Sequence, residues 1–179
     1  MADRKKRGFY REYLNDFQRT ADGGYVYRGE CFRYDGDEAR KKRFAAALAV
    51  LTALAAAFVA VPECLEPTEM SRSPITIIPW GLSLAAVFAV VWTAVRLLVR
   101  LNDLKAYIFE KTVRRLPLFC IIACALSCAT TLSQIIYICV FGISGDPVPV
   151  ILRAVFSALC AAACFCMFSL IRAARFTSK

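Results

Sequence analysis

Four apolar, uncharged stretches dominate the pattern of the chain. Residues 44–61 and 75–95 supply 18 and 21 uncharged positions, residues 116–143 supply 28, and residues 148–171 are interrupted only by Arg153. A helix needs about 20 apolar residues to cross a hydrocarbon core about 30 Å thick. The stretches lack the alternation of polar and apolar residues that a membrane β-barrel needs. The pattern therefore predicts four transmembrane helices, the first of barely sufficient length.

Composition supports this class. The chain has 179 residues, of which 59% are hydrophobic and 21% charged, and its mean hydropathy is +0.52. Soluble domains average about 45–50% apolar residues. These values exclude a disordered chain, a collagen-like fibre and a small soluble disulfide scaffold. The expected fold is an all-α membrane protein, a four-transmembrane-helix bundle over residues 44–179 with a small cap over residues 1–43.

The distribution of Lys and Arg predicts the orientation. Residues 1–43 contain 12 of them, residues 96–115 contain six, and the tail after residue 171 contains three, whereas the opposite side has only Arg72 and Arg153. Basic residues concentrate on the cytoplasmic side of membrane proteins. We expect a multi-pass protein of the plasma membrane with both termini in the cytoplasm.

An amphipathic helix is predicted near the N-terminus. Tyr10, Tyr13, Leu14 and Phe17 follow the spacing of one helical face, with basic residues around it. Such a helix can lie on the membrane surface with its aromatic side chains at the boundary. It would form the first part of the cytoplasmic cap.

A β-hairpin over residues 25–34, turning at Gly29, is the second predicted part of the cap. Strand side chains alternate between two faces, so four aromatic residues would share one face: Tyr25, Tyr27, Phe32 and Tyr34. That face would pack within the cap, dip into the membrane interface or dock a partner protein. Aromatic and Arg residues together can stack nucleic acid, but the acidic residues around them argue against this, and no nucleic-acid partner is expected.

The basic run Arg40-Lys41-Lys42-Arg43 directly precedes the first span. Runs of this kind anchor the topology of a membrane helix and also attract anionic lipid headgroups. The sequence therefore predicts contact with the lipid bilayer and its anionic headgroups through basic flanks.

The predicted spans contain no His, Asp, Glu or Lys, and the whole chain contains no His. Membrane transporters and proteases generally use ionisable groups at depth, and no nucleophile–histidine pair can form. We therefore expect no enzyme activity, no catalytic residues and no cofactor.

Arg153 is the single charge within a predicted span, and Gln134, Ser133 and Tyr137 lie at a similar depth in the third. The two interpretations are a polar contact that holds helices together and a contact with an anion or substrate.

Cysteines form a regular pattern on the last two spans. Three of them follow helical spacing on the third span and three lie at matching depths on the fourth: Cys120, Cys124, Cys128, Cys160, Cys164 and Cys166. Thiolates bind soft metals such as Cu(I) or Zn(II). Cysteine also packs like a small residue where helices approach closely. We favour packing and keep the metal site as the alternative.

Cys64 and Cys139 both fall at the predicted outer boundary of the membrane, where a disulfide is permitted. Two separate thiols are the favoured interpretation, because a bridge would require the first and third helices to meet at their outer ends.

Two functional classes follow from these features. The first is a non-enzymatic accessory or scaffold subunit that binds a membrane-protein partner. The second is a small transporter or channel, built as a homo-oligomer, that uses Arg153 and Gln134 or a cysteine-lined metal site.

Overall fold

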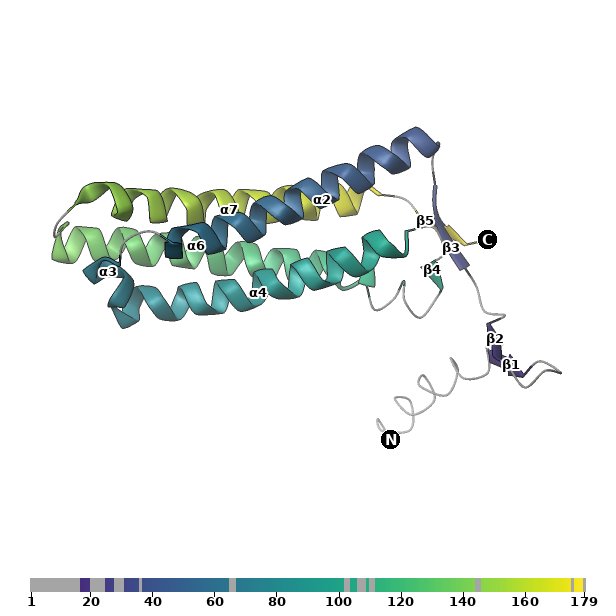
Figure 1. Ribbon diagram of the computed structural model, residues 1–179, viewed down its shortest axis with the longest axis horizontal. Coiled ribbons are helices and arrows are strands. Elements are labelled where there is room, and N and C mark those ends of the chain that lie inside the picture. Colours follow the sequence, from purple (N-terminus) through teal and green to yellow (C-terminus); the bar gives the residue numbers. More distant parts are fainter. Residues whose placement is uncertain are drawn as a thin grey trace.

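Four long helices make up most of the protein in the computed structural model (Figure 1). They are α2 (Glu38–Ala60), α4 (Pro74–Val99), α6 (Leu116–Phe141) and α7 (Pro147–Ala173). All four are long and apolar enough to cross a membrane, so the fold is a four-helix membrane bundle. The structure describes residues 17–19, 25–27, 31–35, 37–64, 67–101, 104–105, 109, 112–143, 146–174 and 176–178.

The helices pack in a ring. α6 makes its most extensive contacts with α7 and α4, and α2 closes the ring by packing on α7 and α4. α2 and α6 share no extensive contact and therefore lie at opposite corners of the ring. The first and third spans are consequently not neighbours.

Proline and capping residues position the helix ends. Pro74 and Pro147 each occupy the first turn of a helix, where a backbone N–H is not needed. The Asp146 side chain accepts a hydrogen bond from the Val148 N–H at 3.0 Å. α6 ends at Gly142, whose φ of 74° is a conformation that glycine adopts without strain. α4, α6 and α7 are each about as long as their apolar stretches, whereas α2 begins in the charged segment before its own.

The bundle buries a narrow core and leaves large apolar side chains on its outside. Leu48, Leu97, Leu116 and Met167 are fully buried. Phe88, by contrast, is 68% exposed on α4, together with many other exposed aliphatic and aromatic side chains. A soluble monomer rarely exposes apolar surface on this scale. The outward faces match a lipid environment.

Short segments cap the bundle at the end that we call the α3 end. After α2, the 3-10 helix η1 (Val61–Cys64) leads towards α3 (Glu69–Arg72). Thr68 and Ser71 form a reciprocal capping box at the start of α3. The Thr76 hydroxyl donates to the Met70 carbonyl, which fixes α3 against α4.

The opposite end, which we call the strand end, contains a three-stranded antiparallel sheet (Figure 1). β3 (Cys31–Tyr34) lies between β4 (Leu104–Lys105) and β5 (Phe176–Ser178). The sheet therefore joins the segment before α2, the α4–α6 connection and the chain after α7. The Phe176 ring also packs edge-on against Phe44 and Phe109, with centroids 6.5 and 5.5 Å apart.

The predicted hairpin over residues 25–34 is not supported. β2 (Tyr25–Tyr27) pairs instead with β1 (Phe17–Arg19), and β3 pairs with distant segments. β1 and β2 flank the sequence Asp22-Gly23-Gly24, a stronger turn signal than the residues around Gly29.

The predicted amphipathic helix is also not supported as part of this cap. Its last position, Phe17, begins strand β1, and the rest of it lies outside the described residues.

Candidate functional site

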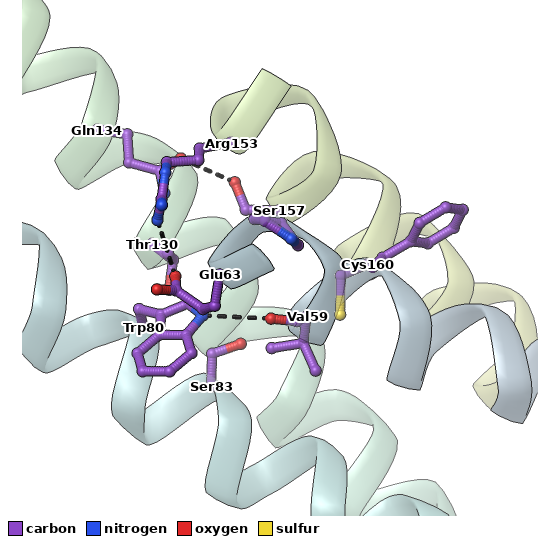
Figure 2. A pocket seen from close by; sticks show the side chains of 11 residues that line it. Val59, Glu63, Trp80, Ser83, Thr130, Gln134, Arg153, Ser157 and Cys160 are labelled. Atoms are coloured by element: carbon purple, nitrogen blue, oxygen red, sulfur yellow. Dashed lines mark hydrogen bonds and ion pairs between the residues drawn. The ribbon is translucent and has the colours of Figure 1, made fainter. Parts of the chain in front are cut away.

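An ion pair joins α7 to the end of η1 (Figure 2). The Nη1 atom of Arg153 donates to Oε1 of Glu63 at 2.9 Å. Arg153 lies six residues after Pro147, which places it about 9 Å along α7 from that end. At this depth in a bilayer an unpaired charge is costly, and the Glu63 carboxylate compensates it.

The two partners differ strongly in exposure. The Arg153 side chain is 5% exposed, whereas the Glu63 side chain is 40% exposed. Pro62, next to Glu63, is buried and holds η1 against the bundle. The pair thus connects a buried cation to a carboxylate at the surface.

Gln134 lies beside this pair and connects α6 to α7. Its Oε1 atom accepts a hydrogen bond from the Ser157 hydroxyl at 3.1 Å, and that hydroxyl lies 2.9 Å from the Thr131 hydroxyl. Arg153 and Gln134 line the same cavities. The structure thus brings the two residues together, and the hydrogen bonds described for them go to other partners, Glu63 and Ser157.

Ser133 and Tyr137 do not join this polar group. The Ser133 hydroxyl donates to the Thr130 carbonyl of its own helix at 2.8 Å. The Tyr137 ring lies against Phe141, with centroids 4.9 Å apart. Their positions along α6 predict a depth similar to that of Arg153. Their side chains, however, point towards the other partners just described.

Deeper in the bundle, hydroxyl and thiol groups connect all four long helices. The hydroxyl oxygens of Ser83 and Ser127 lie 2.9 Å apart, and the Ser127 hydroxyl donates to Cys160 Sγ at 3.5 Å. The Cys160 thiol donates in turn to the Ala55 carbonyl at 3.7 Å. Trp80 ties α4 to α2, because its indole N–H donates to the Val59 carbonyl at 3.3 Å.

Two small cavities border the ion pair. Both are lined by Glu63, Trp80, Gln134 and Arg153. The inner one, of about 20 Å³, also reaches Ser83, Thr130 and Cys160. The outer one, of about 40 Å³, reaches Met70, Ser71 and Thr76 at the α3 end. A cavity needs a volume of about 10–15 Å³ to hold one water molecule. The cavities therefore have room for a few water molecules beside polar partners.

The pairing of Glu63 with Arg153 is not predicted by the pattern of polar residues within the apolar stretches. Glu63 follows the first apolar stretch and therefore does not stand out as a charge within a predicted span. The sequence nevertheless contains a signal for this pairing. An acidic residue lies just beyond the first span, and a basic residue lies just inside the fourth, so the two charges fall at similar depths. Opposite charges at equal depth in a membrane protein are expected to pair.

The six cysteines that form the regular pattern on α6 and α7 differ in exposure. Cys120, Cys160 and Cys164 are buried, Cys124 is half-buried, and Cys128 and Cys166 are exposed. Within the described part of the chain, no three His, Cys, Asp or Glu side chains gather in a way that could hold a metal. The buried thiols sit among the small and apolar residues of the core.

Cys64 and Cys139 are both free and exposed. Cys64 follows α2, and Cys139 lies on α6. These two helices are not neighbours in the ring and share no extensive contact. The helix arrangement thus separates the two thiols.

The four aromatic residues of the predicted interface divide between two sheets. Tyr25 and Tyr27 belong to β2, with Tyr27 opposite Phe17. Phe32 and Tyr34 belong to β3, with Tyr34 opposite Phe176. They therefore do not form one face of a single hairpin.

Comparison with protein-family models, with curated proteins and with solved structures finds no match to this chain. The described site offers a buried cation, a surface carboxylate and space for water.

Proposed function

We propose that the protein is a non-enzymatic accessory or scaffold subunit that binds a partner protein at its strand end. The observation that carries this proposal is the sheet itself. β5 pairs with β3 along one edge and, among the described residues, with no strand along the other. The outer edge of such a strand presents backbone donors and acceptors to which an extended segment of another protein can add.

Charge supports a partner of acidic character. The three segments that meet in the sheet belong to regions holding 21 of the 23 Lys and Arg residues. By the positive-inside rule, this end faces the cytoplasm of a plasma-membrane protein. The proposed partner therefore contributes an extended, acidic, cytoplasmic segment. The same basic regions would also hold anionic headgroups at the membrane surface.

The interior supports a structural role for the bundle. Its described polar side chains mainly connect helices to one another, as in the Ser83–Ser127 and Gln134–Ser157 hydrogen bonds. Interhelical hydrogen bonds of this kind stabilise a membrane bundle. A rigid bundle would hold the three strand segments in register for a partner.

A small oligomeric transporter or channel is the second candidate. It is favoured by the two cavities that reach Arg153 and Gln134. Their volumes suit water, so passage of a larger solute would need an opening of the bundle or a path between subunits. Flux of a polar solute into liposomes containing the purified protein, lost on Arg153→Met, would favour this candidate.

Site-specific photo-crosslinking tests the scaffold proposal. A benzoylphenylalanine at Thr177 in β5 is compared with one at Trp92, which lies on the exposed face of α4. The expected result is a protein adduct from position 177 alone, with the cross-linked peptide mapping to an acidic segment of one protein. A purified form of that segment should then bind the full-length chain. Adducts only with lipid, or equal protein adducts from both positions, would contradict the proposal.

A further inference from the structure

The Glu63 carboxylate accepts a hydrogen bond from only part of the Arg153 guanidinium. The Nη1 atom of Arg153 donates to Glu63, whereas the buried Nε atom has no hydrogen-bond partner among the described residues. A guanidinium presents five donors in a planar fork, and two of them can bind one carboxylate in parallel. The site therefore retains unused donor capacity at a side chain that is 5% exposed.

The cavity space lined by Arg153 extends to the α3 end of the bundle. The ion pair borders both cavities, which also share Trp80 and Gln134. Figure 2 shows the Arg153 guanidinium and the Glu63 carboxylate facing each other among the side chains of the inner cavity. A ligand at Arg153 would therefore meet the Gln134 amide and the Trp80 indole.

The Glu63 carboxylate can leave this position more easily than Arg153 can. Its side chain is 40% exposed and projects from the short helix η1, so rotation about its own bonds takes it into water. The volume that it leaves is that of a methylene and a carboxylate, which is the size of acetate. The group that fits the vacated site is thus a small carboxylate.

We propose that Arg153 anchors a binding site for a small carboxylate at the α3 end, and that Glu63 is the tethered carboxylate that occupies this site when no ligand is bound. The ligand competes with Glu63 and accepts hydrogen bonds from the parallel N–H groups of the Arg153 guanidinium. This inference concerns the end of the bundle opposite the proposed partner surface. It stands or falls independently of partner binding.

The test uses the full-length protein in detergent, with thermal unfolding followed during titration with sodium acetate. Sodium chloride at equal ionic strength serves as the reference. Glu63→Ala creates the acetate-sized space, and Glu63→Gln is the matched control that removes the charge but keeps the space filled. Acetate should raise the unfolding temperature of Glu63→Ala in a saturable manner, and that of Glu63→Gln much less.

Wild-type protein should show the same response at higher acetate concentration. Because a tethered group acts at an effective concentration in the millimolar range, the midpoint should lie at least about tenfold higher than in Glu63→Ala. The double variant Glu63→Ala/Arg153→Met should not respond. If it fails to fold, Glu63→Ala/Arg153→Lys replaces it, because lysine keeps the charge but loses the fork.

Three results would overturn the proposal. The first is a response of Glu63→Ala to chloride equal to its response to acetate. The second is a response that survives the loss of the Arg153 fork. The third is a wild-type protein that never responds, because Glu63 would then not be a displaceable occupant.

Discussion

Arg153 and Glu63 are 90 residues apart in the sequence, yet the Nη1 atom of one lies 2.9 Å from Oε1 of the other. The contact fastens the start of α7 to the end of η1, at the same end of the bundle where α3 packs against α4. A buried Arg needs such a partner, and Glu63 supplies it from a surface position.

The contributions of Glu63 and Arg153 to the free energy of unfolding should be coupled. Loss of one partner of a fully buried pair costs about 3–5 kcal/mol. Because Glu63 is partly exposed, we expect Glu63→Ala to lower the free energy of unfolding by about 1–3 kcal/mol. Arg153→Met should cost less, because it leaves the remaining charge near water.

A double-mutant cycle measures this coupling. The combined variant Glu63→Ala/Arg153→Met should be more stable than the sum of the single effects predicts, by at least about 0.5 kcal/mol. Reversible unfolding in mixed micelles provides the measurement. Strictly additive effects would mean that the two charges do not stabilise each other.

Ser127 should contribute measurable stability through its interhelical contacts. Ser127→Ala removes its hydrogen bonds to Ser83 and Cys160, and single hydrogen bonds in membrane proteins average about 0.6 kcal/mol, with a maximum of about 1.7. Ser169→Ala is the matched control, because Ser169 is exposed and its described hydrogen bond goes to the Phe165 carbonyl of its own helix. An equal loss of stability in the two variants would contradict the interhelical role.

The helical part of the fold could be predicted from the sequence because it depends on local properties. Length, hydropathy and the absence of charge define each span, and Pro147 and Gly142 mark two of their ends. The sheet could not be predicted in the same way. β3 finds its partners at Leu104–Lys105 and Phe176–Ser178, and no local pattern records a pairing between segments so far apart.

The candidate site was predictable only in part. Arg153 and Gln134 stand out as polar residues within apolar stretches. Glu63 does not, because its role depends on how η1 returns the chain towards α7. The directions of Ser133 and Tyr137 likewise depend on the rotation of α6 about its axis, which depth along the sequence does not determine.

Cysteine replacements should separate buried from exposed thiols. Cys120→Ala, Cys160→Ala and Cys164→Ala each remove a buried sulfur and leave a small void, at a cost of about 1 kcal/mol each. Cys128→Ala and Cys166→Ala should be nearly neutral, because both residues are exposed. The measurement is unfolding of each variant, with metal analysis of the wild-type protein. Stoichiometric metal that is lost on replacement of Cys120, Cys124 and Cys128 would contradict the packing account.

Cys64 and Cys139 should remain separate thiols. The diagonal arrangement of α2 and α6 keeps their segments apart, and a disulfide needs Cα atoms about 4.4–6.8 Å from each other. Protein purified in the presence of an alkylating agent should yield two individually alkylated peptides by non-reducing mass spectrometry. A linked peptide within one chain would require α2 and α6 to be neighbours.

The proposed cytoplasmic partner depends on one claim: the strand end faces the cytoplasm and the Glu63–Arg153 pair faces the opposite side of the membrane. Labelling of single introduced cysteines in intact cells, with a reagent that does not cross the membrane, tests it most directly. All native cysteines are first replaced, and new ones are placed at Thr20, Thr68 and Thr177. The account predicts labelling at position 68 and none at positions 20 and 177 until the membrane is permeabilised. Labelling of position 20 or 177 in intact cells, with position 68 protected, would contradict it.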